Sequence, residues 1–359
     1  MILRPKPTLD EFIKTCTPLL KIPELERDEQ NTMKDYLDQV VKGDCLKVLA
    51  TIEDNSVDMC FADPPFNLEK KYTAYNDQRL PDEYLTWCEQ WLHELWRITK
   101  PTGSIFVHNI PRWLTYYSAI LNKFAYFRHW ISWDAMSNPL GKTLLPAHYG
   151  ILFYVKQPTD FKFYDVRTPH KRCRVCSSYL KDYGGKKDQM HSFGTLVSDV
   201  WTDIHRIRHH VRRDEHPCQL PTPLLERLVL MSTDPGDVVL DPFLGTGTTA
   251  IAAKALGRHF VGVELDLEYV KIAKAKLAQV QASTHEGFYV SKYLGKIQSI
   301  RDIDAAKIFP PQLTSAEKKR LRAENGNGHE AKIQPKLLEK PAQYPARGKN
   351  GQKHVEKVP

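Results

Sequence analysis

The residues with the clearest chemical meaning lie in the segment Val238–Leu265, VVLDPFLGTGTTAIAAKALGRHFVGVEL. One apolar run ends at Asp241, a loop with Gly245 and Gly247 follows, and a second apolar run ends at Glu264. Glycines let the backbone approach a ligand, and a carboxylate that ends a strand can accept hydrogen bonds from both hydroxyls of a ribose. The segment therefore predicts a nucleoside site. Its spacing differs from the G-x-G-x-x-G of dinucleotide sites, and it has no GK[ST] for a triphosphate.

A second segment, Asp58–Leu68, reads DMCFADPPFNL and predicts a different chemistry. An apolar strand delivers Asp63 into two prolines and an aromatic ring. Prolines fix φ and lack an N–H, so the loop is stiff and its carbonyls are free to accept hydrogen bonds. Asp63 and the carbonyl of Pro64 can accept both N–H groups of an aromatic amine, while Phe66 offers a flat face for stacking. An Asp-Pro-Pro turn alone is a common end to a strand, and its pairing with the nucleoside loop is what favours catalysis.

The elements around the two loops alternate between short β-rich runs and longer helical ones. We expect strands at Val57–Ala62, Gly103–His108, Tyr149–Val155, Val238–Asp241 and Phe260–Glu264, and an amphipathic helix at Asp82–Thr99. Strands that alternate with helices favour a mostly parallel α/β sheet with helices on both faces. The segment from about 160 to 215 breaks this rhythm, and we expect it to be an insertion at the rim of the sheet.

Together, the two loops resemble the β-group of amino-DNA methyltransferases, in which the catalytic motif precedes the cofactor motif. The resemblance covers about residues 40–280. It implies a class I methyltransferase fold, Rossmann-like, with a seven-stranded, mostly parallel sheet and one antiparallel edge strand, and it implies that the nucleoside is S-adenosylmethionine. Matched position by position, the catalytic motif is Asp63, Pro64, Pro65 and Phe66. The matched cofactor positions are Asp44, His216, Gln219, Asp241, Phe243, Gly245, Gly247, Thr248 and Glu264.

The reaction that the resemblance implies is a direct transfer of methyl from the sulfonium to the exocyclic amine of a base in duplex DNA. Because a base inside a duplex cannot reach the loop, we expect the enzyme to flip it out of the stack. The first motif position favours adenine N6, since Asp or Asn is typical of adenine enzymes and Ser of cytosine enzymes, and here it is Asp63. Cytosine N4 stays an alternative, because some cytosine-N4 enzymes also carry Asp.

Three rival functions fit the sequence less well. Pro217-Cys218-Gln219 also matches the nucleophile of cytosine-C5 methyltransferases, but it precedes Asp241 and no Glu-Asn-Val accompanies it. A methyltransferase that acts on RNA or on protein glutamine could use a related loop. A non-catalytic DNA-binding relative would be expected to have lost Asp63 or the glycines, and the sequence retains them.

The net charge of +8 is concentrated in two segments. Residues 162–213 contain 12 Lys and Arg against 5 Asp, and residues 314–359 contain 11 Lys and Arg against 5 Glu. Such concentration is typical of proteins that neutralise DNA phosphates, although a solvated basic surface is the plainer explanation for the tail. We expect target recognition in the first segment. Its candidate DNA-binding residues are Lys186, Lys187, Arg206, Arg208, Arg212 and Arg213.

The seven cysteines predict two different roles. Cys173 and Cys176 have the spacing of half a zinc knuckle, and the nearby histidines or Cys218 could complete the four ligands that structural zinc needs. The alternative is a pair of thiols without metal. Single cysteines in apolar or helical patterns are expected to be reduced and buried. They are Cys16, Cys45, Cys60 and Cys88.

These patterns predict five parts of the chain. They are an N-terminal extension (1–37), a catalytic part (38–160), a target-recognition insertion with the candidate zinc knuckle (161–215), a cofactor-binding part (216–284) and a basic C-terminal extension (285–359), disordered from about 314. The first residues carry charges and prolines, and no window approaches the ~20 apolar residues of a membrane span. We therefore expect a cytoplasmic protein with no membrane association, with double-stranded DNA as partner and a restriction endonuclease as a candidate partner. The sequence does not predict the oligomeric state.

Overall fold

A computed structural model of the chain describes residues 33–68, 77–135, 144, 146–169, 194–207, 219–281 and 298–299. All of them belong to one unit, Met1–Pro311. The strands of its main sheet are β1 (Gln39–Lys42), β2 (Val57–Ala62), β3 (Thr99–Asn109), β4 (Tyr126–Asp134), β5 (His148–Val155), β8 (Val200–Trp201), β9 (Val238–Asp241) and β10 (His259–Glu264). The helices are α2 (Met33–Tyr36), α3 (Cys45–Thr51), α4 (Pro81–Ile98), α5 (Pro111–Leu121), α6 (Thr222–Ser232), α7 (Thr248–Ala255) and α8 (Leu267–Ala278).

Each element expected from the sequence is present, with ends that lie within four residues of the prediction. The largest difference is at the start of β3, which begins at Thr99, while the prediction began at Gly103. Pro101 lies in this first part, where the register between β2 and β3 shifts between Val57 and Met59. Proline cannot donate to a strand ladder and is confined to edges and irregular positions. The sequence pattern therefore placed the start of the strand too late.

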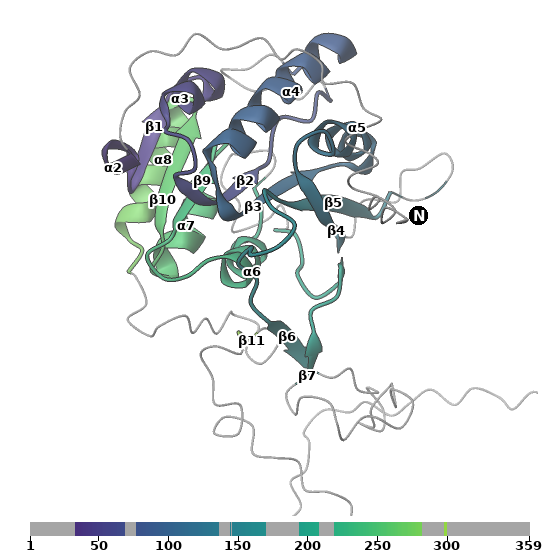
Figure 1. The fold of residues 1–359 in the computed structure, drawn as a ribbon. Coiled ribbons are helices and arrows are strands. Elements are labelled where there is room, and N and C mark those ends of the chain that lie inside the picture. The colour runs from purple at the N-terminus through teal and green to yellow at the C-terminus, as the bar shows by residue number, and fades with distance from the viewer. Residues whose placement is uncertain are drawn as a thin grey trace, which may run out of the picture. The chain divides into compact units, whose positions relative to one another are not determined.

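Within the described residues, the main sheet has eight strands in the order β1-β10-β9-β2-β3-β5-β4-β8. Figure 1 labels the strands from β1 to β4. The neighbours from β1 to β3 are parallel, which confirms the mostly parallel sheet. The eighth strand is the two-residue β8, which pairs in parallel with β4. The expected antiparallel strand is β5, but its expected position at the edge is wrong, because it pairs with β3 on one side and β4 on the other. Its run Ile151–Val155 is buried throughout, as an interior strand with covered faces requires.

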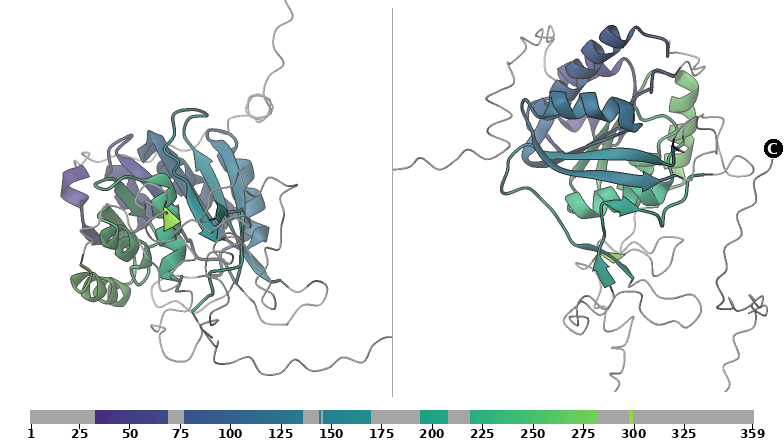
Figure 2. Two further views of the ribbon diagram at one scale, coloured as in Figure 1. Left: turned by 90° about the horizontal axis from the view of Figure 1, so that it is seen from below. Right: turned by 90° about the vertical axis from the view of Figure 1, so that its right-hand side faces the viewer.

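Helices cover both faces of this sheet, as the alternation of elements predicts (Figure 2). Small and aliphatic side chains pack α6, α7 and α8 against one face. On the other face, α3, α4 and α5 contribute Leu49, Trp91 and Tyr117 to a second apolar cluster. α4 is amphipathic, with Trp87, Trp91 and Leu95 buried at helical spacing. No helix in the described part of the chain is long and apolar enough to cross a membrane.

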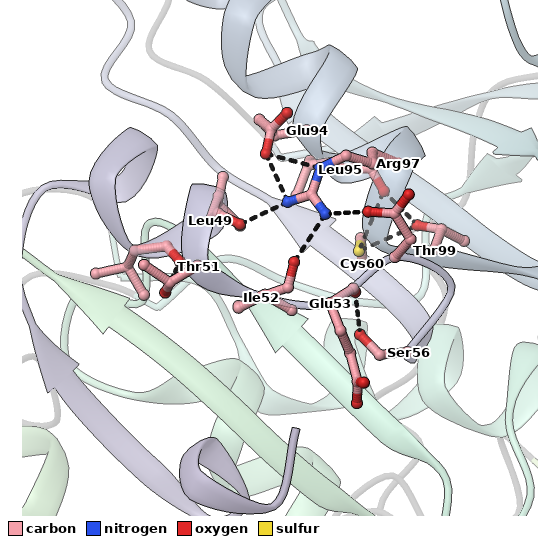
Figure 3. Close-up of polar contacts among 12 residues, drawn as sticks. Leu49, Thr51, Ile52, Glu53, Ser56, Cys60, Glu94, Leu95, Arg97 and Thr99 are labelled. Carbon is pink, nitrogen blue, oxygen red and sulfur yellow. Dashed lines mark hydrogen bonds and ion pairs between the residues drawn. The ribbon is translucent and has the colours of Figure 1, made fainter. Parts of the chain in front are cut away.

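Arg97 fastens the end of α4 to the end of α3 (Figure 3). Its two Nη atoms donate to the carbonyls of Ile52 and Leu49, each at 2.7 Å. The carboxylates of Glu94 and Asp54 pair with the same guanidinium. Burial alone would lower the pKa of Arg97, but its hydrogen bonds to Glu94 and Asp54 and their charges raise it. The guanidinium therefore stays charged in the core and fixes the two helices that flank the first strands of the site.

A second, three-stranded sheet lies in and beyond the predicted insertion. It consists of β6 (Val166–Pro169), β7 (Gly194–Leu196) and β11 (Gln298–Ser299), all paired antiparallel. After β7, the chain returns to the main sheet through β8, which pairs with β4. Trp201 and Ile204 are buried there, and Nε1 of Trp133 donates to the carbonyl of Ile204 at 2.7 Å. The last part of the insertion thus packs into the core of the main sheet.

Three of the four single cysteines follow the prediction. Cys45, Cys60 and Cys88 are buried and form no disulfide. Burial raises the pKa of Cys60 and of Cys88 to about 12, so both are neutral thiols at physiological pH. Cys16 lies outside the described residues.

Candidate active site

A cavity of about 320 Å³ lies at the carboxyl ends of β1, β10, β9 and β2. Because β9 and β2 are neighbours in the sheet, the two predicted loops meet at this edge although they lie far apart in the sequence. The predicted site residues that line the cavity are Asp44, Asp63, Pro64, Pro65, Phe66, Gln219, Asp241, Phe243, Gly245, Thr248 and Glu264. The structure therefore brings the catalytic and the cofactor motifs into one site.

Asp241 organises the start of the cofactor loop. Its Oδ1 accepts the N–H of Phe243 at 2.9 Å, and its Oδ2 accepts the hydroxyl of Thr249. The first bond closes the turn after β9, and the second ties that turn to the first turn of α7. Burial, with the nearby charges of Asp63 and Glu264, raises the pKa of the Asp241 carboxyl to about 7. Asp241 is therefore harder to ionise than an aspartate in water.

The glycines and Glu264 complete the cofactor loop. Gly245 and Gly247 have φ of 56° and 93°, in the left-handed region that favours glycine. A Cβ at Gly247 would also lie 3.0 Å from the Cβ of Ala273. The carboxylate of Glu264 accepts the N–H of Gly245 at 2.7 Å and that of Asp266 at 2.8 Å. Burial raises the pKa of Glu264, while these backbone hydrogen bonds oppose the shift. They also fix the carboxylate at the C-terminal end of β10.

Asp44 borders the same cavity from the end of β1. It is the N-cap of α3, and its side chain accepts the N–H groups of Leu46 and Lys47 at 3.0 and 3.2 Å. The preceding Gly43 donates its N–H to the carbonyl of Glu264 at 3.0 Å. Aspartate is a favoured N-cap because it satisfies the unpaired N–H groups of the first turn. The same residue thus caps a helix and lines the cavity with its neighbours on β10.

The lining of the cavity is strongly acidic. Its carboxylates come from Asp44, Asp63, Asp241, Glu264 and Asp266, against a single guanidinium, Arg79, among the described lining residues. Arg79 lies over the ring of Trp87 at 4.8 Å, and Trp87 meets Phe243 edge-on at 5.5 Å. Clefts lined by one sign of charge concentrate ligands of the opposite sign. The cavity therefore favours a cationic ligand and disfavours phosphates.

The carbonyls of the catalytic loop are not equivalent. Tyr84 donates its hydroxyl to the carbonyl of Pro65, and Nε1 of Trp113 donates to the carbonyl of Phe66 at 2.7 Å. No described residue donates to the carbonyl of Pro64. The carbonyl that the sequence assigns to the amine is thus the one that the surrounding residues leave available.

The exit of the catalytic loop is held by side chains. Asn67 has φ of 52°, a left-handed conformation that Asn tolerates. The carboxylate of Asp77 accepts the N–H groups of Asn67 and Leu68 at 2.8 and 3.0 Å. The Asn67 side chain in turn bonds the N–H and the carbonyl of Arg79, each at 2.9 Å. These contacts link the catalytic loop to a residue that lines the cofactor side of the cavity.

Asp63 has a partner that the sequence analysis did not anticipate. Nδ1 of His108, on β3, lies 2.8 Å from Oδ1 of Asp63. His108 is only 2% exposed, and its ring lies 5.8 Å from that of Phe66, 5.9 Å from that of Trp133 and 5.3 Å from that of Tyr149. His108 therefore contacts both Asp63 and Phe66 of the catalytic motif.

The sequence analysis missed His108, Arg79 and Trp87 because none belongs to a motif. A positional signal existed for His108, which was predicted to end a strand. In parallel α/β sheets, ligand-binding residues gather where the strands end, and β3 is the neighbour of β2. Arg79 and Trp87 carry no such signal, since they come from the segment before α4 and from within it.

Several predicted residues lie outside the described residues. They are His216, the basic residues Lys186, Lys187, Arg208, Arg212 and Arg213, and the cysteines Cys173 and Cys176. Arg206 is described and half-buried, and it does not line the cavity. The described part of the chain contains no group of three or more His, Cys, Asp or Glu arranged to hold a metal ion. The DNA-binding and zinc assignments stay predictions.

Comparison with known proteins decides the family. Residues 57–275 match the DNA methylase family of N6- and N4-methyltransferases. This chain belongs to that family. The matched region begins with β2 and ends within α8, so both loops of the site lie inside it. The chain is therefore a DNA methyltransferase of the N6/N4 type.

Individual relatives of this family cover most of the chain. The type II methyltransferase M.BamHI of Bacillus amyloliquefaciens is 37% identical over 88% of this chain and 74% of its own length. The DNA adenine methyltransferase YhdJ of Escherichia coli is 30% identical over 72% of this chain and 87% of its own length. Among solved structures, the complex of M1.HpyAVI with SAM has a TM-score of 0.45 at 22% identity, covering 67% of this chain and 98% of that one.

Proposed function

We propose that this protein transfers a methyl group from S-adenosylmethionine to the exocyclic amine of adenine in double-stranded DNA. The observation that carries the proposal is one cavity in which an acidic nucleoside site adjoins the Asp63–Phe66 loop. The nucleoside site supplies a methyl donor, and the loop supplies acceptors for an amine. Neither loop alone defines this reaction.

The cofactor site fits a cationic nucleoside. Each carboxylate oxygen of Glu264 accepts one backbone N–H and has a further lone pair for a ribose hydroxyl. The sulfonium of S-adenosylmethionine is favoured by the surrounding carboxylates, whereas the phosphates of a nucleotide cofactor would be repelled. The N-terminus of α7 borders the cavity at Thr248, where backbone N–H groups favour the carboxylate of the methionine moiety.

The loop residues act on the amine and not on the methyl group. Oδ2 of Asp63 and the carbonyl of Pro64 accept the two N–H groups of the target amine, while Phe66 stacks on the base. These hydrogen bonds localise the lone pair on nitrogen, which attacks the methyl carbon as the S–CH₃ bond breaks. The products are S-adenosylhomocysteine and a methylated amine, whose extra proton passes to Asp63 and then to water. Alignment and acceptors placed at the developing charge supply the rate enhancement.

The choice of adenine rests on Asp63. Asp at this first position of the motif is typical of the adenine enzymes in the group that the sequence resembles. YhdJ, named as a DNA adenine methyltransferase, supports the same base. The same geometry can hold the amine of cytosine, and a cytosine-N4 product is the outcome that would correct the proposal.

Access to a base in duplex DNA requires that the base leave the stack, because Asp63 is only 14% exposed in its loop. We propose that the basic insertion supplies the phosphate contacts that hold the opened duplex, and Arg206 is the one of its six candidate DNA-binding residues that the structure describes. A cognate restriction endonuclease is a further proposed partner, since the type II methyltransferase M.BamHI is similar over most of the chain.

Identification of the product tests this function. The purified protein is incubated with S-adenosylmethionine and genomic DNA from a host without DNA methylation, and the DNA is digested to nucleosides for mass analysis. We expect N6-methyladenine, and the Asp63→Ala variant serves as the blank. If the product is N4-methylcytosine, the target base is cytosine and not adenine, and the proposed cofactor and catalytic loop stand unchanged. Methylated RNA or protein, with unmodified DNA, would overturn the proposed function.

A further inference from the structure

The buried imidazole of His108 has an unusual set of contacts. Nδ1 lies 2.8 Å from Oδ1 of Asp63, and this is the only polar contact of the ring within the described residues. Nε2 is buried and has no hydrogen-bond partner in the part of the chain that the structure describes. Burying a polar atom without a partner costs free energy, and such atoms in native structures call for an explanation. A ring retained for packing alone would be replaced at lower cost by an apolar side chain.

The direction of the contact follows from the chemistry of its two groups. An ionised carboxylate accepts hydrogen bonds and donates none, so Nδ1 of His108 must carry the proton. The bond occupies Oδ1 of Asp63 and leaves Oδ2 for the amine. A carboxylate that can rotate about its Cβ–Cγ bond would present either oxygen, whereas this bond fixes its plane.

The position of the ring couples Asp63 to the stacking surface. His108 contacts Phe66, Trp133 and Tyr149, which come from the catalytic loop, β4 and β5. The imidazole is therefore held from three directions by aromatic rings and directs Nδ1 at Asp63. A group oriented by locked neighbours positions its partner within the narrow limits that catalysis needs.

We infer that His108 is a positioning residue for methyl transfer, which donates from Nδ1 to Asp63 and so aims the other carboxylate oxygen at the target amine. The inference rests on the proposed function, in which Asp63 accepts the amine. It assigns to His108 no contact with the base or with the cofactor.

Two substitutions separate this role from packing. In His108→Asn, the side-chain amide nitrogen takes the place of Nδ1 and can still donate to Asp63. In His108→Leu, the volume is kept and the donor is lost. We expect His108→Leu to lower kcat by about 100-fold, the scale of a 1 Å misplacement, with the Kd values for S-adenosylmethionine and DNA within about threefold of the wild type. We expect His108→Asn to recover kcat to within about tenfold of the wild type.

The ranking of the two variants is the decisive result. If the ring only packs, Leu suits the aromatic surroundings better than Asn, and His108→Leu will be the more active. That ranking, or equal activity, overturns the inference. The matched control is the same pair of substitutions at His129, an exposed residue of β4 whose ring stacks on Phe153 at 6.3 Å away from the loop. Both His129 variants should keep wild-type kcat.

A second measurement does not depend on activity. Nitrogen-15 NMR of the full-length protein reports which imidazole nitrogen is protonated, and His108 is assigned by the signal missing in His108→Asn. A protonated Nδ1 whose shift changes in Asp63→Ala supports the contact. An unprotonated Nδ1 overturns the inference whatever the kcat values of the variants are. Methylation of DNA by the wild type tests the proposed function separately, so failure of one can be told from failure of the other.

Discussion

The two loops of the site reach the same edge of the sheet but are held in different ways. The cofactor loop is organised largely by its own residues, through the bonds from Phe243 and Thr249 to Asp241 and from Gly245 to Glu264. The catalytic loop makes no such bonds between its own residues in the described structure. Side chains from the surrounding elements hold it instead, among them Tyr84, Trp113, Asp77 and His108.

This difference separates binding from chemistry. A loop held by its own bonds forms the same shape whenever its two strands are paired, which suits a cofactor that is always the same. A loop held by its neighbours depends on the correct packing of α4, α5 and β3 around it. We therefore expect changes in the cofactor loop to act on affinity and stability, and changes around the catalytic loop to act on turnover.

The largest effect is expected for Asp63→Ala, which removes the charged acceptor of the amine. Loss of one preorganised partner at a reacting centre costs about 100- to 1,000-fold in kcat. Among the described residues Asp63 forms no hydrogen bond to the cofactor loop, and four other carboxylates remain in the cavity lining, so the Kd for S-adenosylmethionine should stay within about threefold. Single-turnover methylation and calorimetric titration measure the two quantities. Appreciable turnover would refute the division of roles.

The converse is expected for Glu264→Ala. Hydrogen bonds to a charged group contribute about 1.5–3 kcal/mol each, so loss of the ribose acceptor should raise the Kd for S-adenosylmethionine by about 50-fold. At saturating cofactor, kcat should change little. Glu268→Ala is the matched control, because Glu268 lies nearby in an exposed ion pair with Lys271. Equal Kd values for the two variants would show that Glu264 does not bind the nucleoside.

A pH-dependent effect is expected for Asp241, whose pKa is raised by burial to about 7 from 3.8. Between these values the folded protein holds a proton that the unfolded chain has released, so rising pH destabilises the fold by up to about 1.4 kcal/mol per pH unit. Above about 7 both states are ionised and this dependence ends. Asp241→Asn removes it. The free energy of unfolding in urea should fall for the wild type relative to Asp241→Asn as the pH rises from 5 to about 7. A difference between the two proteins that does not change with pH would exclude the titration of Asp241.

The smallest effect is expected for Tyr84→Phe, which frees the carbonyl of Pro65 and keeps the ring. We expect kcat to fall about fivefold, the scale of one neutral hydrogen bond of about 1 kcal/mol. Tyr117→Phe is the control, since its hydroxyl bonds that of Tyr84 at 2.7 Å and does not touch the loop. Steady-state kinetics should place the control within about twofold of the wild type. If Tyr117→Phe lowers kcat more than Tyr84→Phe does, the hydrogen bond from Tyr84 to the carbonyl of Pro65 is not the cause of the effect.

The same contrast explains what could be predicted from the sequence. The cofactor loop was predictable because its glycines, Asp241 and Glu264 interact with one another across a short segment. The strands were predictable from their apolar runs, with an error at β3 where Pro101 lies in an irregular ladder. The partners of the catalytic loop were not predictable, because Tyr84, Trp113 and His108 reach it across sequence separations that only the packed fold defines.

The position of β5 could not be predicted for a related reason. Its run of apolar residues indicates burial on both faces but does not say which strands are its neighbours. The resemblance to a family predicted one antiparallel strand. The pairing of β5 with β3 and β4 shows that this strand lies inside the sheet.

The strand order β1-β10-β9-β2 has a consequence for how the chain is made. The two strands that carry the cofactor loop insert between two strands from the opposite end of the described chain, and Asp58 on β2 accepts the N–H of Val238, 180 residues later. A ribosome therefore releases β1 and β2 long before the strands that separate them exist. Closure of such distant pairs is slow. The edge of β2 that pairs with β9 therefore stays open after β2 and β3 can already pair, and the site is complete only when the half that binds the methyl donor has been made.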